Sequence, residues 1–222
     1  MPAILFDIDG TLLDSVDLHA RAWQEAFLAF GKDIPFETIR SQIGKGGDQL
    51  LPVFFTPAEL AARGKEIERW RSDWWKLRYM PEVRPFPGVR PLFLAVRERG
   101  WTPVAASSSK EDELTFYLRV LEVADLIEGS TSKDDVARSK PHPDIFAAAL
   151  DRVSWRERPG SWVVGDSPWD AIAASRLRLP TVGFRSGGFP EGDLRAAGVQ
   201  ILFDGPADLL AHLDRSPFED RR

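Results

Sequence analysis

The chain of 222 residues contains no cysteine. This absence excludes disulfides, thiolate metal sites and a cysteine nucleophile, and it is typical of proteins from reducing compartments. No stretch approaches the roughly 20 apolar residues that a membrane-spanning helix needs. The first apolar run, which begins at Ala3, is not preceded by a basic segment. We therefore expect no secretory signal and a cytoplasmic location.

An excess of positive charge is also missing. The formal net charge is -5 and the sequence pI is about 5.3. Phosphate backbones and anionic lipid surfaces attract clustered Lys and Arg, so we expect neither nucleic acid nor a membrane as a partner. The hydrophobic fraction of 43% and the charged fraction of 28% are those of an ordinary globular protein. The sequence does not reveal the oligomeric state, and a monomer is the default expectation.

Short apolar segments alternate with helical patterns through most of the chain. The apolar segments predict buried parallel strands at residues 3–8, 102–106, 161–164, 181–184 and 200–203. Helical periodicity predicts helices at residues 89–99, 111–121, 143–153, 169–175 and 207–213. This alternation is typical of an α/β fold with a Rossmann-like core built on a parallel sheet. We expect the final residues, 214–222, to be frayed.

One segment interrupts this alternation. Residues 15–81 show helical spacing of apolar side chains and no convincing strand pattern. Within them, Thr56-Pro57-Ala58-Glu59 is a capping box with proline at the first helical position, so a long helix is predicted to begin there and run toward Tyr79. We therefore predict an α/β core of residues 1–14 and 82–222 with an inserted helical cap of residues 15–81.

Polar side chains follow the predicted strands at the point where each one ends. They are Asp7 and Asp9, then Ser107 and Ser108, then Asp166 with Asp170, and Lys140 lies ahead of a predicted helix. In open α/β sheets, ligands bind beyond the carboxyl ends of the strands. Carboxylates bind Mg²⁺, an aspartate can form a covalent phosphoenzyme, and Lys with hydrogen-bond donors stabilises the charge of a transferring phosphoryl group. The set therefore predicts phosphoryl transfer through an aspartate.

The same residues form four motifs in a fixed order. These are Asp7-Ile8-Asp9-Gly10-Thr11-Leu12, the strand-ending Ser107, Lys140-Pro141 and Gly165-Asp166-Ser167. Together they resemble the haloacid dehalogenase superfamily of phosphatases over nearly the whole chain. The helical insert after the first motif is similar to that of members capped at this place, which include phosphoglycolate phosphatases and β-phosphoglucomutases.

The resemblance implies a role for each catalytic residue. Asp7 is the expected nucleophile and a Mg²⁺ ligand. Asp9 is the expected general acid and base, and its backbone carbonyl is also expected on the metal. Lys140 is expected to neutralise charge on the nucleophile and on the phosphoryl group. Ser107 and the amide of Ser108 are expected to hold the transferring phosphate.

The remaining roles also follow from the resemblance. Asp166 is expected to complete the metal site, with Asp170 behind it or bound through water. Thr11 is placed with the substrate-binding residues and is expected to support the orientation of Asp9. His19 is a further candidate near the substrate, because it lies at the junction of core and cap, where some related mutases also carry a histidine.

The cap contains a glycine-rich stretch, Ile43-Gly44-Lys45-Gly46-Gly47-Asp48. It matches neither the dinucleotide-binding pattern nor the P-loop, and no strand pattern precedes it. It is either a turn between helices or a cap loop in which Lys45 contacts the non-reacting part of the substrate. β-Phosphoglucomutases tend to place an Arg near this loop to hold a distal phosphate, and here Gly47 occupies that place.

The sequence therefore favours a Mg²⁺-dependent phosphatase that hydrolyses a small phosphorylated metabolite through an aspartyl phosphate on Asp7. A phosphosugar mutase of the β-phosphoglucomutase type is the alternative, and the missing cap Arg disfavours it. Halide removal is less expected, because the dehalogenases of the family work without metal and lack an acid of the Asp9 type. A non-catalytic binding protein that retains the fold is the third alternative. The sequence does not name the substrate.

Overall fold

The computed structural model describes residues 1–156 and 158–221, and within them a six-stranded parallel sheet forms the centre of the molecule. The strand order is β5-β4-β1-β6-β7-β8. The strands are β1 (Ala3–Phe6), β4 (Thr102–Ala106), β5 (Gly129–Thr131), β6 (Trp162–Gly165), β7 (Thr181–Phe184) and β8 (Ile201–Phe203). The central strands are buried along their whole length because both faces of the sheet are covered. The predicted Rossmann-like α/β fold is confirmed.

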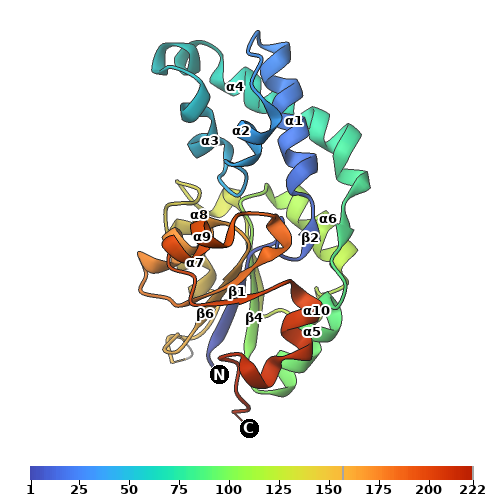
Figure 1. Cartoon of the computed structure of the whole chain (residues 1–222), viewed down its shortest axis with the longest axis vertical. Coiled ribbons are helices and arrows are strands. Elements are labelled where there is room, and N and C mark those ends of the chain that lie inside the picture. The colour runs from blue at the N-terminus through green and yellow to red at the C-terminus, as the bar shows by residue number, and fades with distance from the viewer. Residues whose placement is uncertain (157, 222) are drawn as a thin grey trace.

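Helices cover the sheet on two sides (Figure 1). They are α5 (Val89–Glu98), α6 (Glu111–Leu121), α7 (Asp144–Leu150), α8 (Pro168–Ser175), α9 (Glu191–Ala196) and α10 (Pro206–Ala211). Side chains of β1 alternate between two apolar clusters, as the pleat of a strand requires. Phe6 packs in the cluster with Phe93, whereas Leu5 packs in the cluster with Phe146. Among the described residues, no helix has the length and apolar character to cross a bilayer.

A second group of helices lies beyond one end of the sheet (Figure 1). They are α1 (Val16–Ala29), α2 (Phe36–Arg40), α3 (Gly47–Phe54) and α4 (Pro57–Trp74), and a π-helical turn over Trp75–Tyr79 continues α4. The helix predicted from the capping box begins where expected, because Thr56 and Glu59 each hydrogen-bond to the other's backbone N–H. These helices share an apolar cluster around Trp23 and Phe27, so this group of helices has a small core of its own.

A short strand pair joins the two ends of the helical insert. β2 (Leu13–Asp14) pairs antiparallel with β3 (Arg84–Pro85), and the sequence did not predict this pair. The pair ties the chain entering the cap to the chain leaving it. The limits of the cap at residues 15 and 81 stay predictions.

The end of the chain differs from expectation, because residues 214–221 are held against the core. Phe218 is fully buried and packs edge-on against Trp101 and Trp162. The backbone N–H of Arg221 donates to the carbonyl of Arg99 at 2.9 Å. The prediction of a frayed tail is therefore wrong for these residues, while residue 222 lies outside the described residues.

Candidate active site

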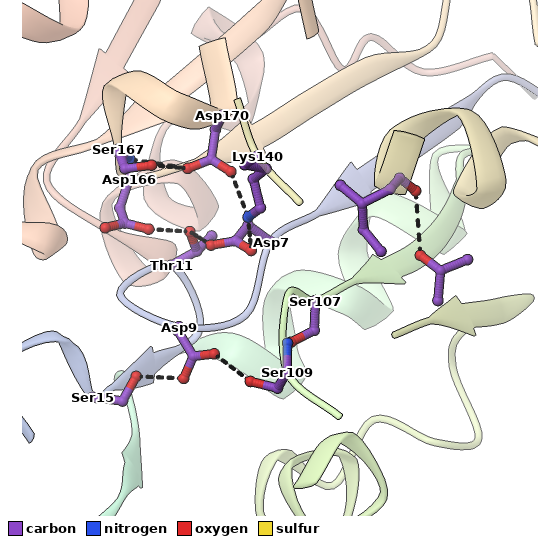
Figure 2. A network of polar contacts seen from close by, with 12 residues as sticks. Asp7, Asp9, Thr11, Ser15, Ser107, Ser109, Lys140, Asp166, Ser167 and Asp170 are labelled. Atoms are coloured by element: carbon purple, nitrogen blue, oxygen red, sulfur yellow. Dashed lines mark hydrogen bonds and ion pairs between the residues drawn. The ribbon is translucent and has the colours of Figure 1, made fainter. Parts of the chain in front are cut away.

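Three buried carboxylates and one buried amine meet at the carboxyl edge of β1 and β6 (Figure 2). The amine of Lys140 contacts Asp7 and donates to Oδ1 of Asp170 at 2.8 Å. The Thr11 hydroxyl donates to Oδ1 of Asp166 at 2.8 Å, and it lies 3.3 Å from Oδ2 of Asp7. The first, third and fourth predicted motifs therefore converge on one place, although they are spread along the chain.

The strands explain why the acids converge. β1 ends at Phe6 and β6 ends at Gly165, and these neighbouring parallel strands pair over their last residues, so Asp7 and Asp166 leave the sheet side by side. Ser167 is the N-cap residue of α8, and its hydroxyl donates to Oδ2 of Asp170 at 2.6 Å within a capping box. The Ser167 hydrogen bond holds Asp170 in place and leaves the other carboxylate oxygen of Asp170 free to accept from Lys140.

The acids outnumber the amine, and their pKa values reflect the imbalance. Burial raises the pKa of Asp7 to about 7, with Lys140 opposing and the charges of Asp170 and Asp9 adding to the rise. Burial and repulsion from Asp170 and Asp7 raise the pKa of Asp166 well above its ordinary value. Burial disfavours the charged form of Lys140, but attraction to Asp170 and Asp7 is larger than this effect of burial and raises the pKa of the amine. The site thus holds more negative charge than its protein groups balance.

This donor set fits a divalent cation. One oxygen each of Asp7, Asp166 and Asp170 lies within 4.8 Å of the others. Carboxylate oxygens are the ligands that Mg²⁺ prefers. A Cβ on Gly10 or Gly187 would stand 2.3 or 1.8 Å from Oδ2 of Asp166, so both glycines keep space around that carboxylate.

Asp9 has a separate set of partners. Ser15 donates to its Oδ1 at 2.8 Å and Ser109 donates to its Oδ2 at 3.1 Å (Figure 2). Nε2 of His19 lies 2.8 Å from Oδ1, and Nδ1 of His19 contacts the guanidinium of Arg71. Because a guanidinium offers only donors, we assign the His19 proton to Nε2, which then donates to Asp9. His19 is thus brought to the expected acid and base.

These contacts set the ionisation of Asp9. Burial would raise its pKa, but His19, together with hydrogen bonds from Ser15 and Ser109, outweighs burial and lowers the pKa to about 2. Asp7 and Asp9 lie two residues apart and yet titrate in opposite directions from the ordinary value. Carboxylates with divergent environments are suited to different chemical roles.

The predicted phosphate-binding residues divide into two kinds. Ser107 is fully buried, and its hydroxyl accepts from the backbone N–H of Ser109 at 3.0 Å. Ser108 lines the cavity, and its buried hydroxyl has no hydrogen-bond partner among the described residues. Thr11 lies differently from expectation, because its hydroxyl bonds to Asp166 and Asp7 rather than supporting Asp9.

A cavity of about 110 Å³ lies between the core and the cap. Asp7, Asp9 and Lys140 contribute to its core side. Around them the cavity is rich in basic side chains. These are Lys45, Arg71, Lys110 and Lys133, and the acids Glu68 and Glu113 also line it. The cavity therefore offers cations beyond Lys140 to an anionic ligand.

The glycine-rich cap loop lies directly on the core. A Cβ on Gly44 would stand 2.7 Å from the Ser167 hydroxyl, so a side chain does not fit at this contact. Lys45 reaches the cavity, where its amine lies 4.0 Å from the centre of the Trp169 ring and donates to Gln42 at 2.6 Å. Burial lowers the pKa of Lys45. The loop is more than a turn between helices, because it forms part of the cavity wall.

Sequence reasoning missed several polar groups around Asp9. Ser109 stands in the Ser107-Ser108-Ser109 segment that was singled out, and Ser15 follows the first motif at the core-to-cap junction. Their positions were therefore available as indications. Nothing in the sequence indicated Arg71, because it is one of many charged residues on a long helix.

An acid-rich site at the carboxyl edge of a Rossmann-like sheet, beneath inserted helices, defines a class of capped α/β hydrolases. The chain belongs to the haloacid dehalogenase-like hydrolase family, because the sequence model of this family matches residues 1–178. It is 31% identical over 180 residues to a phosphoglycolate phosphatase of Nitrosospira multiformis, which covers 78% of each chain. It is 30% identical over 228 residues to a phosphoglycolate phosphatase of Cereibacter sphaeroides, covering 96% of this chain and 99% of the other.

A solved structure gives the same picture. A hydrolase from Pseudomonas syringae superposes with a TM-score of 0.85 at 30% identity, covering 97% of this chain and 99% of the other. The family and these relatives identify the chain as an enzyme, a phosphatase of the haloacid dehalogenase type.

Proposed function

We propose that this enzyme is a Mg²⁺-dependent phosphatase that hydrolyses a small phosphorylated metabolite through an aspartyl phosphate on Asp7. The observation that carries the proposal is the separation of two carboxylates. Asp7 lies in a buried cluster with Lys140, whereas Asp9 is held apart by hydroxyl and imidazole donors. The first environment suits a nucleophile next to a metal. The second keeps a carboxyl group apart from the metal cluster and favours its ionised form, so Asp9 takes up a proton before it serves as the acid.

In the proposed first step, an oxygen of Asp7 attacks phosphorus and the bond to the alcohol breaks. The leaving alcohol takes a proton from Asp9. Asp9 then accepts a proton from the water that attacks the phosphoenzyme, which releases phosphate and restores Asp7. Lys140 orients Asp7 and offsets phosphoryl charge, and the Ser108 hydroxyl is available as a donor to a phosphate oxygen.

Asp7, Asp166 and Asp170 would hold the Mg²⁺, with the backbone carbonyl of Asp9 as a further ligand implied by family resemblance. When bound, the ion would compensate the carboxylate charge and the charge on the phosphoryl oxygens. Lys140 alone leaves that charge unbalanced, since it pairs with Asp7 and Asp170 while a third buried acid, Asp166, lies beside them.

The cavity supports a small and acidic substrate. Its volume of about 110 Å³ is well below the roughly 300–1,000 Å³ of sites for drug-sized ligands. Its extra basic side chains suit a second anionic group. Because the relatives are named phosphoglycolate phosphatases, phosphoglycolate is the first ester to assay.

The phosphosugar mutase is less well supported. A side chain on Gly47 would meet Glu68 and the Trp23 ring, with Oε1 of Glu68 at 3.0 Å. That position therefore offers no cation for a distal phosphate.

The experiment that tests the proposed function is metal removal. Hydrolysis of phosphoglycolate and of an aryl phosphate is expected to fall to background in excess chelator and to return when Mg²⁺ is added. The same titration can be followed by melting temperature, since an ion that binds only the folded chain stabilises it. Sustained turnover by protein shown to be metal-free would exclude the assigned site.

The stabilisation by Mg²⁺ is expected to depend on pH. The pKa of Asp7 is raised from 3.8 to about 7 in the folded chain, so its ionisation costs stability progressively between these pH values and fully above them, while protons compete with the metal below pH 7. Asp166 shifts in the same direction. At a fixed Mg²⁺ concentration, the rise in melting temperature is therefore expected to be larger at pH 8 than at pH 5.5. An equal rise at both would contradict a site built on these acids.

Lys45→Ala is expected to act unevenly between substrates. A small aryl phosphate needs few distal contacts and should lose little kcat/KM. The physiological ester should lose about 1.5–3 kcal/mol, the worth of a charge-assisted hydrogen bond. Lys32→Ala is the matched control, because Lys32 is another cap lysine over an aromatic ring, at 4.4 Å from the Phe55 centre, and it does not line the cavity. Equal losses on both esters would show that Lys45 does not select the substrate.

A further inference from the structure

Asp48 joins the cap to the core at a point beside the cavity. It lies in the first turn of α3, and its Oδ1 accepts from the Lys133 amine at 2.6 Å. Its Oδ2 accepts from the backbone N–H of Ser139 at 3.1 Å. Lys133 and Ser139 belong to the core segment after β5, so one cap carboxylate satisfies two donors of a distant part of the chain.

The position of these donors connects the contact to catalysis. Ser139 directly precedes Lys140, whose amine contacts Asp7 and Asp170. Asp48 is therefore bonded to the residue next to the buried lysine of the active site. Asp48 itself is not among the described residues that line the cavity, although its partner Lys133 is.

The neighbouring backbone is fitted to the same contact. A Cβ on Gly46 would stand 2.1 Å from the Ser139 hydroxyl, so the two segments approach more closely than a side chain allows. Burial opposes the ionisation of Asp48, but hydrogen bonds from Lys133, Gln49 and Ser139 outweigh burial and lower its pKa. The carboxylate is thus charged at neutral pH and matched to its donors.

We infer that Asp48 is a positioning residue that latches the closed cap onto the core segment carrying Lys140. The Ser139 N–H and the Lys133 amine gain this acceptor only when the cap loop lies against the core. Each bond that forms only in the closed state shifts the equilibrium toward that state. The kinetic consequence rests on the proposed function, because closure matters to turnover only if the site hydrolyses phosphate esters.

Hydrogen exchange tests the contact directly. In protein with Mg²⁺ and inorganic phosphate, Asp48→Ala is expected to speed exchange of the Ser139 amide by about 10-fold, the order expected when a charged acceptor is lost. Asp48→Asn keeps an acceptor for Ser139 but no charge for Lys133, so it should restore part of the protection. Glu59→Gln is the matched control, because it breaks the ion pair with Lys32 inside the cap and leaves the cap-to-core contact intact.

Kinetics then distinguishes a latch from a substrate contact. Asp48→Ala is expected to lower kcat/KM by roughly 10-fold on phosphoglycolate and by a similar factor on the aryl phosphate, because the latch acts on the closed form whichever ester is bound. This pattern differs from the uneven loss expected for Lys45→Ala. Glu59→Gln should leave both values unchanged.

Each contrary result is decisive. Unchanged Ser139 exchange in Asp48→Ala overturns the latch, and so does a kcat/KM loss confined to one ester. Equal losses in the Glu59→Gln control would replace the latch with general destabilisation of the cap. If the wild-type protein hydrolyses no phosphate ester, the proposed function fails, while the exchange measurement still decides whether Asp48 holds the cap.

Discussion

Asp7→Asn is expected to abolish turnover and the phosphoenzyme together. The amide keeps nearly the size of the carboxylate and can still accept a hydrogen bond from Lys140, but it cannot form the covalent bond to phosphorus. Loss of a covalent nucleophile costs on the order of 10⁵- to 10⁶-fold in kcat. The measurement is steady-state hydrolysis together with intact-mass detection of phosphoprotein after rapid acid quenching.

Protein stability separates this chemical loss from misfolding. The pKa of Asp7 is raised to about 7 in the folded state, so its charge destabilises the folded chain at higher pH and ceases to do so at low pH. Removing the charge should therefore leave the melting temperature of metal-free protein at pH 8 unchanged or raised. Asp125→Asn is the control, because it breaks an exposed pair with Arg90, and neither residue lines the cavity or belongs to the acid cluster. A phosphoprotein formed by Asp7→Asn would place the nucleophile elsewhere.

The meeting of the acids with Lys140 was predictable, because the strands of a parallel sheet end at the same edge and the residues that follow them lie close together. Asp7 and Asp166 each follow an apolar run, and neighbouring parallel strands deliver such residues to one edge. The capping box that begins α4 was equally local, since Thr56 and Glu59 are three residues apart. Features determined within a few residues, or by the common direction of the strands, could be found without coordinates.

Features that depend on distant partners were not predictable. β5 has the sequence Gly-Ser-Thr, which carries no apolar pattern, and it is a strand because β4 pairs with it. Phe218 is buried only because Trp101 and Trp162 lie where the chain ends. Asp48 looked like part of a glycine-rich turn, since its donors lie far along the sequence.

The direction of the Thr11 side chain was also not predictable from the sequence, although its expected partner lies nearby in the chain. Resemblance predicted that it supports Asp9, only two residues away. The chain turns at Gly10, whose φ of 82° is left-handed, and the Thr11 hydroxyl meets Asp166 and Asp7 instead. The direction of a side chain within a motif thus depends on a turn that the pattern of residue types does not specify.

Asp9→Asn is expected to separate proton transfer from covalent chemistry. Asn keeps an oxygen that accepts from Ser15, Ser109 or His19, so the surroundings of residue 9 should change little. Without a carboxyl group, the leaving alcohol receives no proton and the attacking water loses its base. Removal of a general acid and base typically costs about 10²- to 10⁴-fold. We expect this loss on phosphoglycolate, an ester with a poor leaving group.

The dependence on the leaving group identifies which half of the reaction Asp9 serves. A nitrophenyl phosphate releases a stable anion, so its leaving group needs no proton. In the Asp9→Asn variant, Asp7 should therefore still become phosphorylated at a rate near that of the wild type, measured as a burst in rapid-quench experiments. Breakdown of the phosphoenzyme should then be slow, because water has no base, and phosphoprotein should accumulate. His19→Gln is the companion variant, since its loss removes a partner that lowers the pKa of Asp9. The pH at which kcat/KM falls through ionisation of Asp9 should move upward in that variant. Wild-type turnover of phosphoglycolate by Asp9→Asn would remove Asp9 from both proton transfers.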